Sequence, residues 1–383
     1  MHRSAYGYWL LTRHDDIAAA LRDPRLSSEW TKKGSLPGVS ARHRAAPDLD
    51  DPFVRAQQVV LHSFNMKDAP DHTRVRQLVQ QAFTRAKVDH QRARVAELVD
   101  ACIDGGLAAG TLDLVTELAF PLTITVASEM IGIPADARDR FRSSFEDTER
   151  LGDPTATDEQ RAAARDALVW QLDFIAAVVD ERRRAPQQDL VSALVQAEDQ
   201  GARLTNDEIL AALLTIYTAA GTTTERMISS GMLLLLRHPE QWALLRARPE
   251  LLGGAVTEIL RYHHPNQQTT TPRLALDDID IRGTIIPAGS TVRVALGAGN
   301  RDPERWDAPE VFDITRPETV SLGFGQGLHY CIGAPLARMQ TQVAVEHLLR
   351  RCPTLALAEG EVRHDPRRMD RYERVQVTLA TAH

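Results

Sequence analysis

The sequence contains little cysteine and no long apolar run. Its three cysteines among 383 residues, Cys102, Cys331 and Cys352, are too few and too scattered for the disulfide framework of a small secreted protein. No stretch approaches the roughly 18 uninterrupted apolar residues of a transmembrane helix. The N-terminal residues MHRSAYGYWLLTRHDD also lack the apolar segment of a signal peptide. We therefore predict a cytoplasmic protein that has no membrane partner.

The sequence also lacks an excess of positive charge. Its 45 Lys and Arg residues and 52 Asp and Glu residues give a formal net charge of −7, so nucleic acid is not expected as a partner. The apolar content of 43% and the charged content of 25% are ordinary for a globular protein. A chain of this length is compatible with one large enzyme domain that includes a smaller lobe. We predict a single domain over residues 1–383.

Helical patterns dominate the first two thirds of the chain. Four segments show them: HDDIAAALRDPRLSS up to Pro24, DHTRVRQLVQQAFT, HQRARVAELVDACIDGGL up to its glycine pair, and DLVTELAFPLTITVASEMIGIP despite Pro121. Two more helical runs lie between Phe141 and Gln187, and the polar GDPTATDEQ between them is a candidate lid. Residues 31–67 contain several prolines and predict a long irregular connection.

Strand patterns are confined to short alternating segments after residue 266. They are PRLAL, IDIRGTIIPAGSTVRVAL and, near the end, ERVQVTLAT. The pattern as a whole predicts a mainly α protein with a minor β lobe.

The longest predicted helix covers residues 206–238, about 33 residues or roughly 50 Å. Thr205 and Glu208 form a capping-box pattern at its start. Its apolar run breaks at GTTTER, where Gly221 and three threonines are poor helix formers, and then resumes as MISSGMLLLLRHP. Two interpretations stay open: a bent core helix with satisfied hydroxyls, or a local opening beside a ligand.

Cys331 lies in the glycine-rich segment SLGFGQGLHYCIGAPLAR. Pro335 is well placed for a helix start, and free N–H groups and the helix dipole there stabilise a thiolate. A nucleophile would need a base, for which His329 is available, whereas the segment has no Cys-x-x-Cys pair for zinc. A single thiolate ligand is typical of haem iron in one class of enzyme. Gly325 and Gly327 would then let a tight hairpin approach the flat macrocycle, and Gly333 would let the helix follow.

The segment FGQGLHYCIG resembles, position by position, the haem-binding signature of the cytochrome P450 superfamily. Further segments resemble the same family in content and order: MKDAPDHTRVR, AGTTTE, TEILRY, PRLALDDIDIRGTIIPAGSTV and NRDPERWDAPEVFD. The resemblance runs from about Trp9 to the C-terminus. It implies the cytochrome P450 fold, a triangular helical prism with a long central helix over the haem. It places the β-rich minor lobe in parts of 1–30 and 266–320 and the helical lobe in the remainder.

The resemblance assigns roles to particular residues. Cys331 would be the proximal thiolate and sole metal ligand of haem b, with Phe324 shielding its sulfur and Gly325 and Gly333 in the same binding loop. Four cationic or imidazole side chains would bind the haem propionates: His72, Arg76, Arg273 and His329. A structural ion-pair triad would consist of Glu258, Arg261 and Arg316.

The resemblance places the oxygen-binding groove at Ala220, Gly221, Thr223 and Thr224. Thr224 has the position of the oxygen-stabilising threonine. Thr223 departs from the family, which usually has an acid there. Glu225 is one step further and therefore rotated by about 100° around the helix. The family also usually has a helix and a strand ahead of GYWLLTRHDD.

The resemblance implies a haem-thiolate monooxygenase that inserts one oxygen of O2 into a small organic, secondary-metabolite substrate. A ferredoxin and its reductase would donate the electrons to a monomeric enzyme, with Arg338, Arg350 and Arg351 as candidates for a basic docking face. One alternative is an oxidase that catalyses oxidative cyclisation, aryl coupling or other non-hydroxylating chemistry. Another is a non-catalytic haem sensor or carrier. Substrate residues would come from 31–67, 141–187 and Gln267–Thr271, whose polar composition is compatible with an oxygenated or peptide-like ligand.

Overall fold

The computed structural model describes residues 1–29, 32, 48–83, 85–153, 155–199, 201–269, 271–317, 321–365 and 371–379. The chain forms two compact units. The larger unit contains Met1–Leu26, Arg85–Thr123 and Ala220–His383, and the smaller unit contains Ser27–Thr84 and Ile124–Ala219. The single domain over 1–383 stays a prediction.

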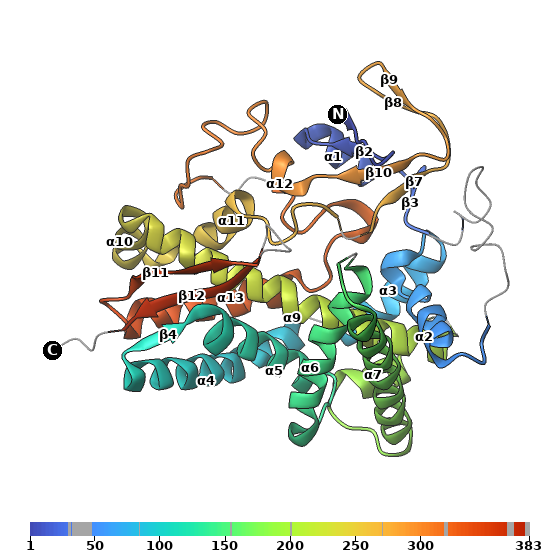
Figure 1. Cartoon of the computed structure of the whole chain (residues 1–383), viewed down its shortest axis with the longest axis horizontal. Helices are drawn as coiled ribbons and strands as arrows, with labels where there is room; N and C mark the ends of the chain where they lie inside the picture. Colours follow the sequence, from blue (N-terminus) through green and yellow to red (C-terminus); the bar gives the residue numbers. More distant parts are fainter. Residues whose placement is uncertain are drawn as a thin grey trace. The chain divides into compact units, whose positions relative to one another are not determined.

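The larger unit carries the C-terminal helices and most of the strands. Its helices are α1 (His14–Ala20), α4 (Arg85–Ala109), α10 (Pro239–Ala247), α11 (Leu252–Tyr262), α12 (Leu296–Gly299) and α13 (Ala334–Arg351). The second part of α9 (Asn206–Arg237) also belongs to it. Figure 1 shows α13 in red-orange and α9 in yellow-green.

Two sheets are built from strands that are far apart in sequence. The first has the order β1 (His2–Arg3), β2 (Trp9–Leu11), β10 (Thr291–Val294), β7 (Arg273–Ala275) and β3 (Leu26–Ser27). In it, β10 is parallel to β2 and antiparallel to β7. The second has the order β11 (Ala356–His364), β12 (Tyr372–Thr378) and β4 (Thr111–Asp113). A separate hairpin joins β8 (Ile279–Ile281) and β9 (Thr284–Ile286).

The strands of the first sheet come from residues 2–27 and 273–294, and the division into lobes stays a prediction. The prediction that strand patterns occur only after residue 266 was wrong, because β1 to β4, β5 (Glu198–Asp199) and β6 (Ala202–Arg203) precede it. These strands have only two or three residues each, too few to show a clear alternation of burial.

Within the described residues, the smaller unit consists of helices and one short hairpin, apart from Ser27 at the end of β3. It contains α2 (Pro52–Leu61), α3 (Asp71–Ala82), most of α5 (Phe120–Met130), α6 (Arg138–Thr148), α7 (Asp158–Arg184), α8 (Leu190–Gln196) and the start of α9. The hairpin joins β5 (Glu198–Asp199) to β6 (Ala202–Arg203). Its core centres on the ring of Phe141, which is edge-on to Tyr217 at 4.6 Å between centroids. The two helices expected between Phe141 and Gln187 are α6 and α7, which confirms that prediction.

The start of α9 confirms the predicted capping box. The Thr205 backbone N–H donates to the Glu208 carboxylate at 2.9 Å, and the Glu208 N–H donates to the Thr205 hydroxyl at 3.2 Å. The helix then continues without interruption through the glycine and threonine segment to Arg237. The Thr123 hydroxyl of α5 donates to the Gly221 carbonyl oxygen at 2.9 Å, so this carbonyl has an acceptor role outside its own helix.

Two local predictions were wrong, and a third, a helix despite Pro121, is confirmed. Residues 31–67 are not irregular throughout, because Asp51 caps α2 and Pro52 occupies its first turn, while most of the segment lies outside the described residues. Helix α4 does not end at the glycine pair but continues to Ala109, and Gly110 follows with φ +77°. A Cβ on Gly106 would lie 2.6 Å from Leu379, so that glycine is required for packing. Pro121 is accommodated because a π-helical turn over Leu114–Ala119 precedes α5.

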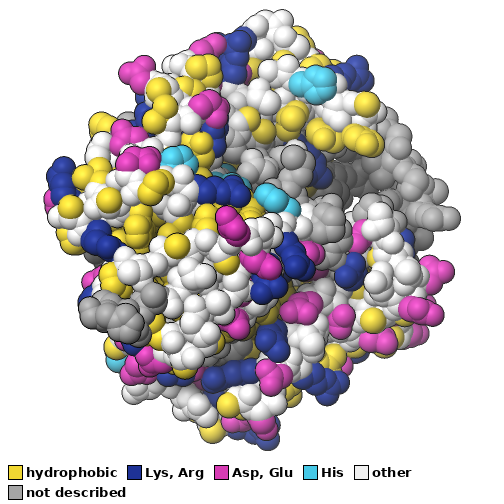
Figure 2. Space-filling view, turned by 60° about the vertical axis from the view of Figure 1, so that its left-hand side comes forward, with side chains coloured by type: hydrophobic (Ala, Val, Ile, Leu, Met, Phe, Trp, Pro, Cys, Tyr) yellow, Lys and Arg dark blue, Asp and Glu magenta, His cyan; other side chains and the backbone are white. Residues whose placement is uncertain are grey.

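On the face drawn in Figure 2, cationic and anionic side chains are interspersed and form no large patch of one sign. Among the helices of the described residues, none combines the length and the apolarity needed to cross a bilayer.

Candidate functional site

Cys331 lies in the loop that leads into α13. Its backbone N–H donates to the Phe324 carbonyl oxygen at 2.9 Å, and the Gly325 N–H donates to the Leu322 carbonyl oxygen at 2.9 Å. Gly333 is the N-cap of α13 and Pro335 lies in its first turn, as the sequence predicted. Cys331 is exposed, whereas burial raises the pKa of the Cys102 and Cys352 thiols. The structure therefore makes Cys331 the most accessible thiol in the chain.

Two glycines of this loop have left-handed backbone conformations, with φ +71° at Gly325 and +69° at Gly327. A Cβ on Gly327 would lie 2.6 Å from the backbone oxygen of Leu21. Gly327 therefore approaches the backbone of another part of the chain closely. A Cβ on Gly325 would meet no protein atom within 4 Å, which leaves space above this residue.

The Phe324 ring packs on a buried cluster formed by Met227, Val256, Leu260 and Ala337. The Arg338 guanidinium lies over the ring, 4.9 Å from its centroid, and donates to the Thr257 hydroxyl at 2.9 Å. These contacts fix the residue whose carbonyl oxygen accepts the Cys331 N–H. Because Arg338 contacts Phe324 and Thr257, it is less available to bind a partner protein.

The other arginines considered for a docking face lie at the C-terminal end of α13. Arg351 pairs with Asp100, at 2.9 Å, and with Asp104. Arg350 approaches the His347 ring, at 3.4 Å. Arg351 is therefore neutralised by carboxylates of α4, which weakens the case for it as a docking cation.

The residues present fit a haem better than a chelated metal ion. No group of three or more His, Cys, Asp or Glu side chains within the described ranges could hold a metal ion. The loop instead offers one accessible thiol and, at Gly325, a backbone that a side chain would otherwise cover. A single thiolate beside open backbone suits a macrocycle that brings its own four nitrogen ligands.

The four candidate propionate ligands are divided between the two units. Arg273 begins β7 and is 7% exposed, and His329 ends a short helical turn over Gly327–His329; both belong to the unit of Cys331. His72 and Arg76 belong to the other unit and are four residues apart on α3, so they share one face of that helix. His72 is fully buried, 6.4 Å from the Phe64 ring between centroids.

The predicted oxygen-binding residues lie within little more than one turn of α9, where Ala220 and Gly221 precede the threonines. Thr224 is buried and Thr223 is half-buried. Glu225 is fully buried, and its carboxylate accepts a hydrogen bond from the Ser229 hydroxyl at 3.2 Å. That contact directs one Glu225 oxygen toward the next turn of the helix.

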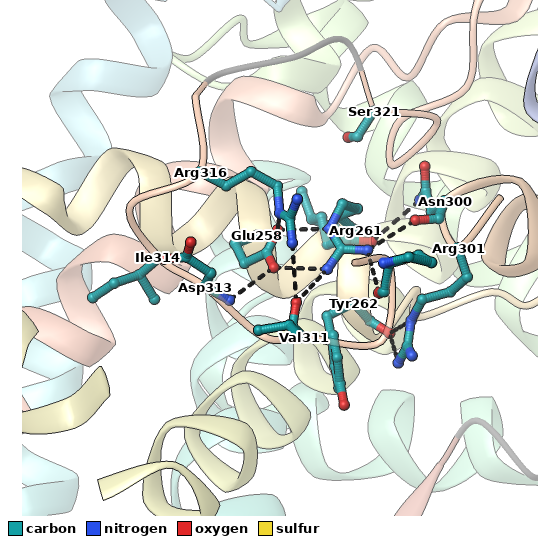
Figure 3. Close-up of polar contacts among 12 residues, drawn as sticks. Glu258, Arg261, Tyr262, Asn300, Arg301, Val311, Asp313, Ile314, Arg316 and Ser321 are labelled. Atoms are coloured by element: carbon teal, nitrogen blue, oxygen red, sulfur yellow. Dashed lines mark hydrogen bonds and ion pairs between the residues drawn. The ribbon is translucent and has the colours of Figure 1, made fainter. Parts of the chain in front are cut away.

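The structure brings Glu258, Arg261 and Arg316 together (Figure 3). Arg261 binds Glu258 through two hydrogen bonds, each 2.7 Å, and the Arg316 Nε lies 3.6 Å from the same carboxylate. The Asp313 N–H donates to Glu258 as well, at 3.0 Å. The Glu258 and Arg261 side chains are 3% and 1% exposed, so this pair is buried.

Both arginines also bind backbone carbonyl oxygens around residues 300–311. Arg261 donates to the oxygens of Asn300, Pro309 and Val311 at 2.8–3.0 Å. Arg316 donates to those of Asp307, Ala308 and Val311 at 2.8–3.3 Å. The triad therefore holds an irregular segment in place, which favours a structural role over a catalytic one.

Two polar residues that the sequence did not single out connect this region to the Cys331 loop. The Asn300 amide donates to the Leu260 carbonyl oxygen at 3.4 Å and accepts from the Leu322 N–H at 2.8 Å. The His264 ring donates to the Gly323 carbonyl oxygen at 2.9 Å. Both lie in or beside segments that resemble the family, NRDPERWDAPEVFD and TEILRY, but no local pattern marks them as supports of a distant loop.

Comparisons with known proteins agree with this geometry. The family profile described as Cytochrome P450 matches residues 151–369. The cytochrome P450 monooxygenase PikC of Streptomyces venezuelae is 40% identical over 352 residues, which cover 91% of this chain and 79% of that protein. The 6-deoxyerythronolide B hydroxylase of Saccharopolyspora erythraea is 38% identical over 350 residues, which cover 91% of this chain and 84% of that protein.

A solved structure of P450BioI, in complex with an acyl carrier protein ligated to hexadec-9Z-enoic acid, superposes with a TM-score of 0.86. It is 32% identical, and the match covers 97% of this chain and 92% of that chain. The predicted fold class is thereby confirmed. The chain is an enzyme, a haem-dependent monooxygenase that belongs to the cytochrome P450 family.

Proposed function

We propose that Cys331 is the thiolate ligand of haem b in a monooxygenase that acts on a secondary metabolite. The observation that carries this proposal is the accessible thiol of Cys331, just ahead of α13, in a loop held by backbone hydrogen bonds. When bound there, the haem supplies the redox chemistry that activates O2. The protein would supply the thiolate ligand of the iron, the orientation of the substrate and the protons that the reaction consumes.

The cationic side chains predicted for the propionates have a simple electrostatic task. His72, Arg76, Arg273 and His329 would donate charge-assisted hydrogen bonds to carboxylates, which are stronger than neutral ones. His72 and Arg273 are buried, at 0% and 7% exposed, so a carboxylate that reached them would be bound away from bulk water, where charge-assisted hydrogen bonds are strong.

The threonines of α9 would manage protons at the site. Thr224 is buried and can orient a hydroxyl, while Thr223 cannot release a proton near neutral pH as a carboxylic acid does. We expect protons to arrive through water held by Thr222–Thr224, or from a polar group of the substrate.

The electron donor and the substrate are proposed as classes. A ferredoxin with its reductase would supply electrons one at a time to a monomeric, cytoplasmic enzyme. The names of the relatives support a secondary metabolite as substrate, since one relative is a 6-deoxyerythronolide B hydroxylase. The three cysteines form no disulfide, in keeping with the proposed compartment.

The test is the spectrum of the reduced carbonyl complex. The wild-type protein should show the strongly red-shifted Soret band of thiolate ligation, and Cys331→Ser should lose it. Cys102→Ser is the matched control, because that thiol is half-buried in α4, and its spectrum should equal that of the wild type. A Cys331→Ser protein that kept the red-shifted band would exclude Cys331 as the ligand.

A second candidate function is oxidation without hydroxylation, such as ring closure or aryl coupling. The observation that favours it is Thr223, because a missing acid matters less where the substrate donates the protons. Analysis of products for incorporation of oxygen from labelled O2 separates the two candidates. The alternative of a non-catalytic haem sensor or carrier is set aside, because the relatives are enzymes.

A further inference from the structure

The turn His264–Asn266, which follows α11, contacts two elements on which the proposed function depends. On one side, the His264 Nε2 lies 2.9 Å from the Gly323 carbonyl oxygen at the start of the Cys331 loop. On the other side, the Arg226 guanidinium of α9 lies 3.3 Å from the Pro265 carbonyl oxygen and 3.2 Å from the Asn266 side-chain oxygen. Both His264 and Arg226 are buried, 3% and 2% exposed.

The contacts of the His264 ring define its tautomer. Its Nδ1 accepts a hydrogen bond from the Asn266 N–H at 3.0 Å, so the proton is on Nε2, which donates to Gly323. Burial lowers the pKa of His264 to about 4, and the ring is neutral at physiological pH. A neutral imidazole has one donor and one acceptor, and both are used here.

The bond to Gly323 acts on the part of the loop that faces Cys331. Gly323 directly precedes Phe324, whose carbonyl oxygen accepts the Cys331 N–H at 2.9 Å. The preceding residue, Leu322, is held by Asn300 at 2.8 Å. Three consecutive residues, 322 to 324, are therefore bonded to different neighbours, and His264 supplies the central bond.

Arg226 connects the turn His264–Asn266 to the threonine segment of α9. It follows Thr224 by two residues on α9, so a displacement of the turn is transmitted to the helix segment that contains Thr224. A guanidinium has five N–H donors in a rigid plane, which suits it to hold two acceptors of one turn at once.

We propose that the turn His264–Asn266 is a positioning element that fixes the Cys331 loop relative to the threonine segment of α9. His264 and Arg226 are its positioning residues. The proposal rests on the assignment of Cys331 as the haem ligand. Loss of the Gly323 bond would let the loop fluctuate and would change the hydrogen bonding around the thiolate, without removing any group that touches haem.

Two substitutions of His264 separate this bond from the general effect of a changed core residue. In Gln, the amide nitrogen replaces the histidine Nε2, so His264→Gln can still donate to Gly323. In Asn, the shorter amide replaces only Nδ1, so His264→Asn keeps the turn contact but cannot reach Gly323. The measurements on the holoenzyme are hydrogen exchange of the peptide covering 322–333, the reduced carbonyl spectrum and the reduction potential.

We expect roughly tenfold faster exchange of this peptide in His264→Asn, since a buried hydrogen bond is lost, and at most a small change in His264→Gln. His264→Asn should also shift the reduction potential and reduce the red-shifted share of the carbonyl spectrum. If His264→Asn does not fold, Asn266→Ala replaces it, because it removes only the side-chain acceptor of Arg226 from a half-buried residue.

Equal behaviour of His264→Asn and wild type would overturn the proposal, as would equal damage by the Asn and Gln variants. If Asn266→Ala is used instead, unchanged hydrogen exchange of the peptide 322–333 together with an unchanged reduction potential would also overturn the proposal. A wild-type protein without the red-shifted band would instead refute the assignment of Cys331, which the exchange measurement does not depend on.

Discussion

Glu258→Ala should destabilise the protein severely, because it removes the counter-charge of a buried arginine. The Glu258 carboxylate receives two 2.7 Å hydrogen bonds from Arg261 and one of 3.0 Å from the Asp313 N–H. Without it, the Arg261 guanidinium, 1% exposed, would keep only its backbone carbonyl partners. Breaking a buried ion pair on one side costs roughly 3–5 kcal/mol. Arg316, 3.6 Å from the same carboxylate, would add to the uncompensated charge.

The assay is urea unfolding together with haem content per protein. We expect Glu258→Ala to be largely haem-free or insoluble, and Glu258→Gln, which keeps the shape but not the charge, to be intermediate. Glu97→Ala is the matched control: Arg94 and Glu97 form a pair at the same spacing, 3.0 Å long, with side chains 42% and 66% exposed. An exposed pair of this kind contributes about 0.2–0.5 kcal/mol, so this variant should behave almost as the wild type.

Soluble, fully haem-loaded Glu258→Ala protein with an unchanged unfolding midpoint would refute this reasoning. It would show that the carbonyl oxygens of residues 300, 309 and 311 can satisfy Arg261 without a counter-charge.

Three further predictions concern the loop, the helix and pH. Thr224→Ala should divert electrons from product to hydrogen peroxide, and Thr223→Asp should leave coupling equal or better; unchanged coupling in Thr224→Ala would favour a proton from the substrate. Gly327→Ala should lower the unfolding midpoint more than Gly360→Ala. Both glycines have positive φ, but only a Cβ on Gly327 would meet a backbone oxygen, at 2.6 Å. Equal midpoints of the two variants would show that this close contact does not destabilise the protein. His264 binds a proton below a pKa of about 4 in the folded protein but below 6.5 when unfolded, so between these values acid favours the unfolded state. Stability should fall by roughly 3 kcal/mol as pH decreases through this range, and by less in His264→Gln, as urea unfolding at several pH values would show.

The sequence predicted best what is local along the chain. The capping box of α9 depends on two residues three apart, and its hydrogen bonds are present. The position of Cys331 ahead of α13 depends on a nearby proline and is also as predicted. Arg316 was assigned to the triad from the family resemblance, and no spacing could have placed it beside Glu258.

Two helix boundaries were predicted wrongly because a glycine or a proline was interpreted from its local sequence alone. The glycine pair in α4 was interpreted as a helix end, but Gly106 is needed because Leu379 and Leu112 pack there. Pro52 was interpreted as part of an irregular segment, although a proline in the first turn after Asp51 is compatible with a helix. The residue that requires Gly106 is Leu379, which is distant in the sequence. The residue that starts α2 is the cap Asp51, which the sequence analysis did not recognise beside Pro52.

The supports of the Cys331 loop were missed because their bonds connect distant residues. His264 and Gly323 are 59 positions apart, and Asn300 and Leu322 are 22 apart. A histidine before a proline and an asparagine before an arginine are ordinary loop residues when considered alone. Only the folded chain shows that each is buried and that its side chain uses both a donor and an acceptor.

The triad and the loop therefore form one connected support rather than two separate features. Arg261 binds the Asn300 carbonyl oxygen, and the side chain of the same Asn300 binds the Leu322 N–H at the start of the loop. Loss of Glu258 would thus act on the Cys331 loop through Arg261 and Asn300. Asn300→Ala should break this connection without unpairing Arg261, since it removes the side chain and leaves the carbonyl oxygen. If Asn300→Ala loses haem as Glu258→Ala does but keeps more of its stability, the triad acts on haem binding through the loop; if it keeps its haem in full, the triad acts on stability alone.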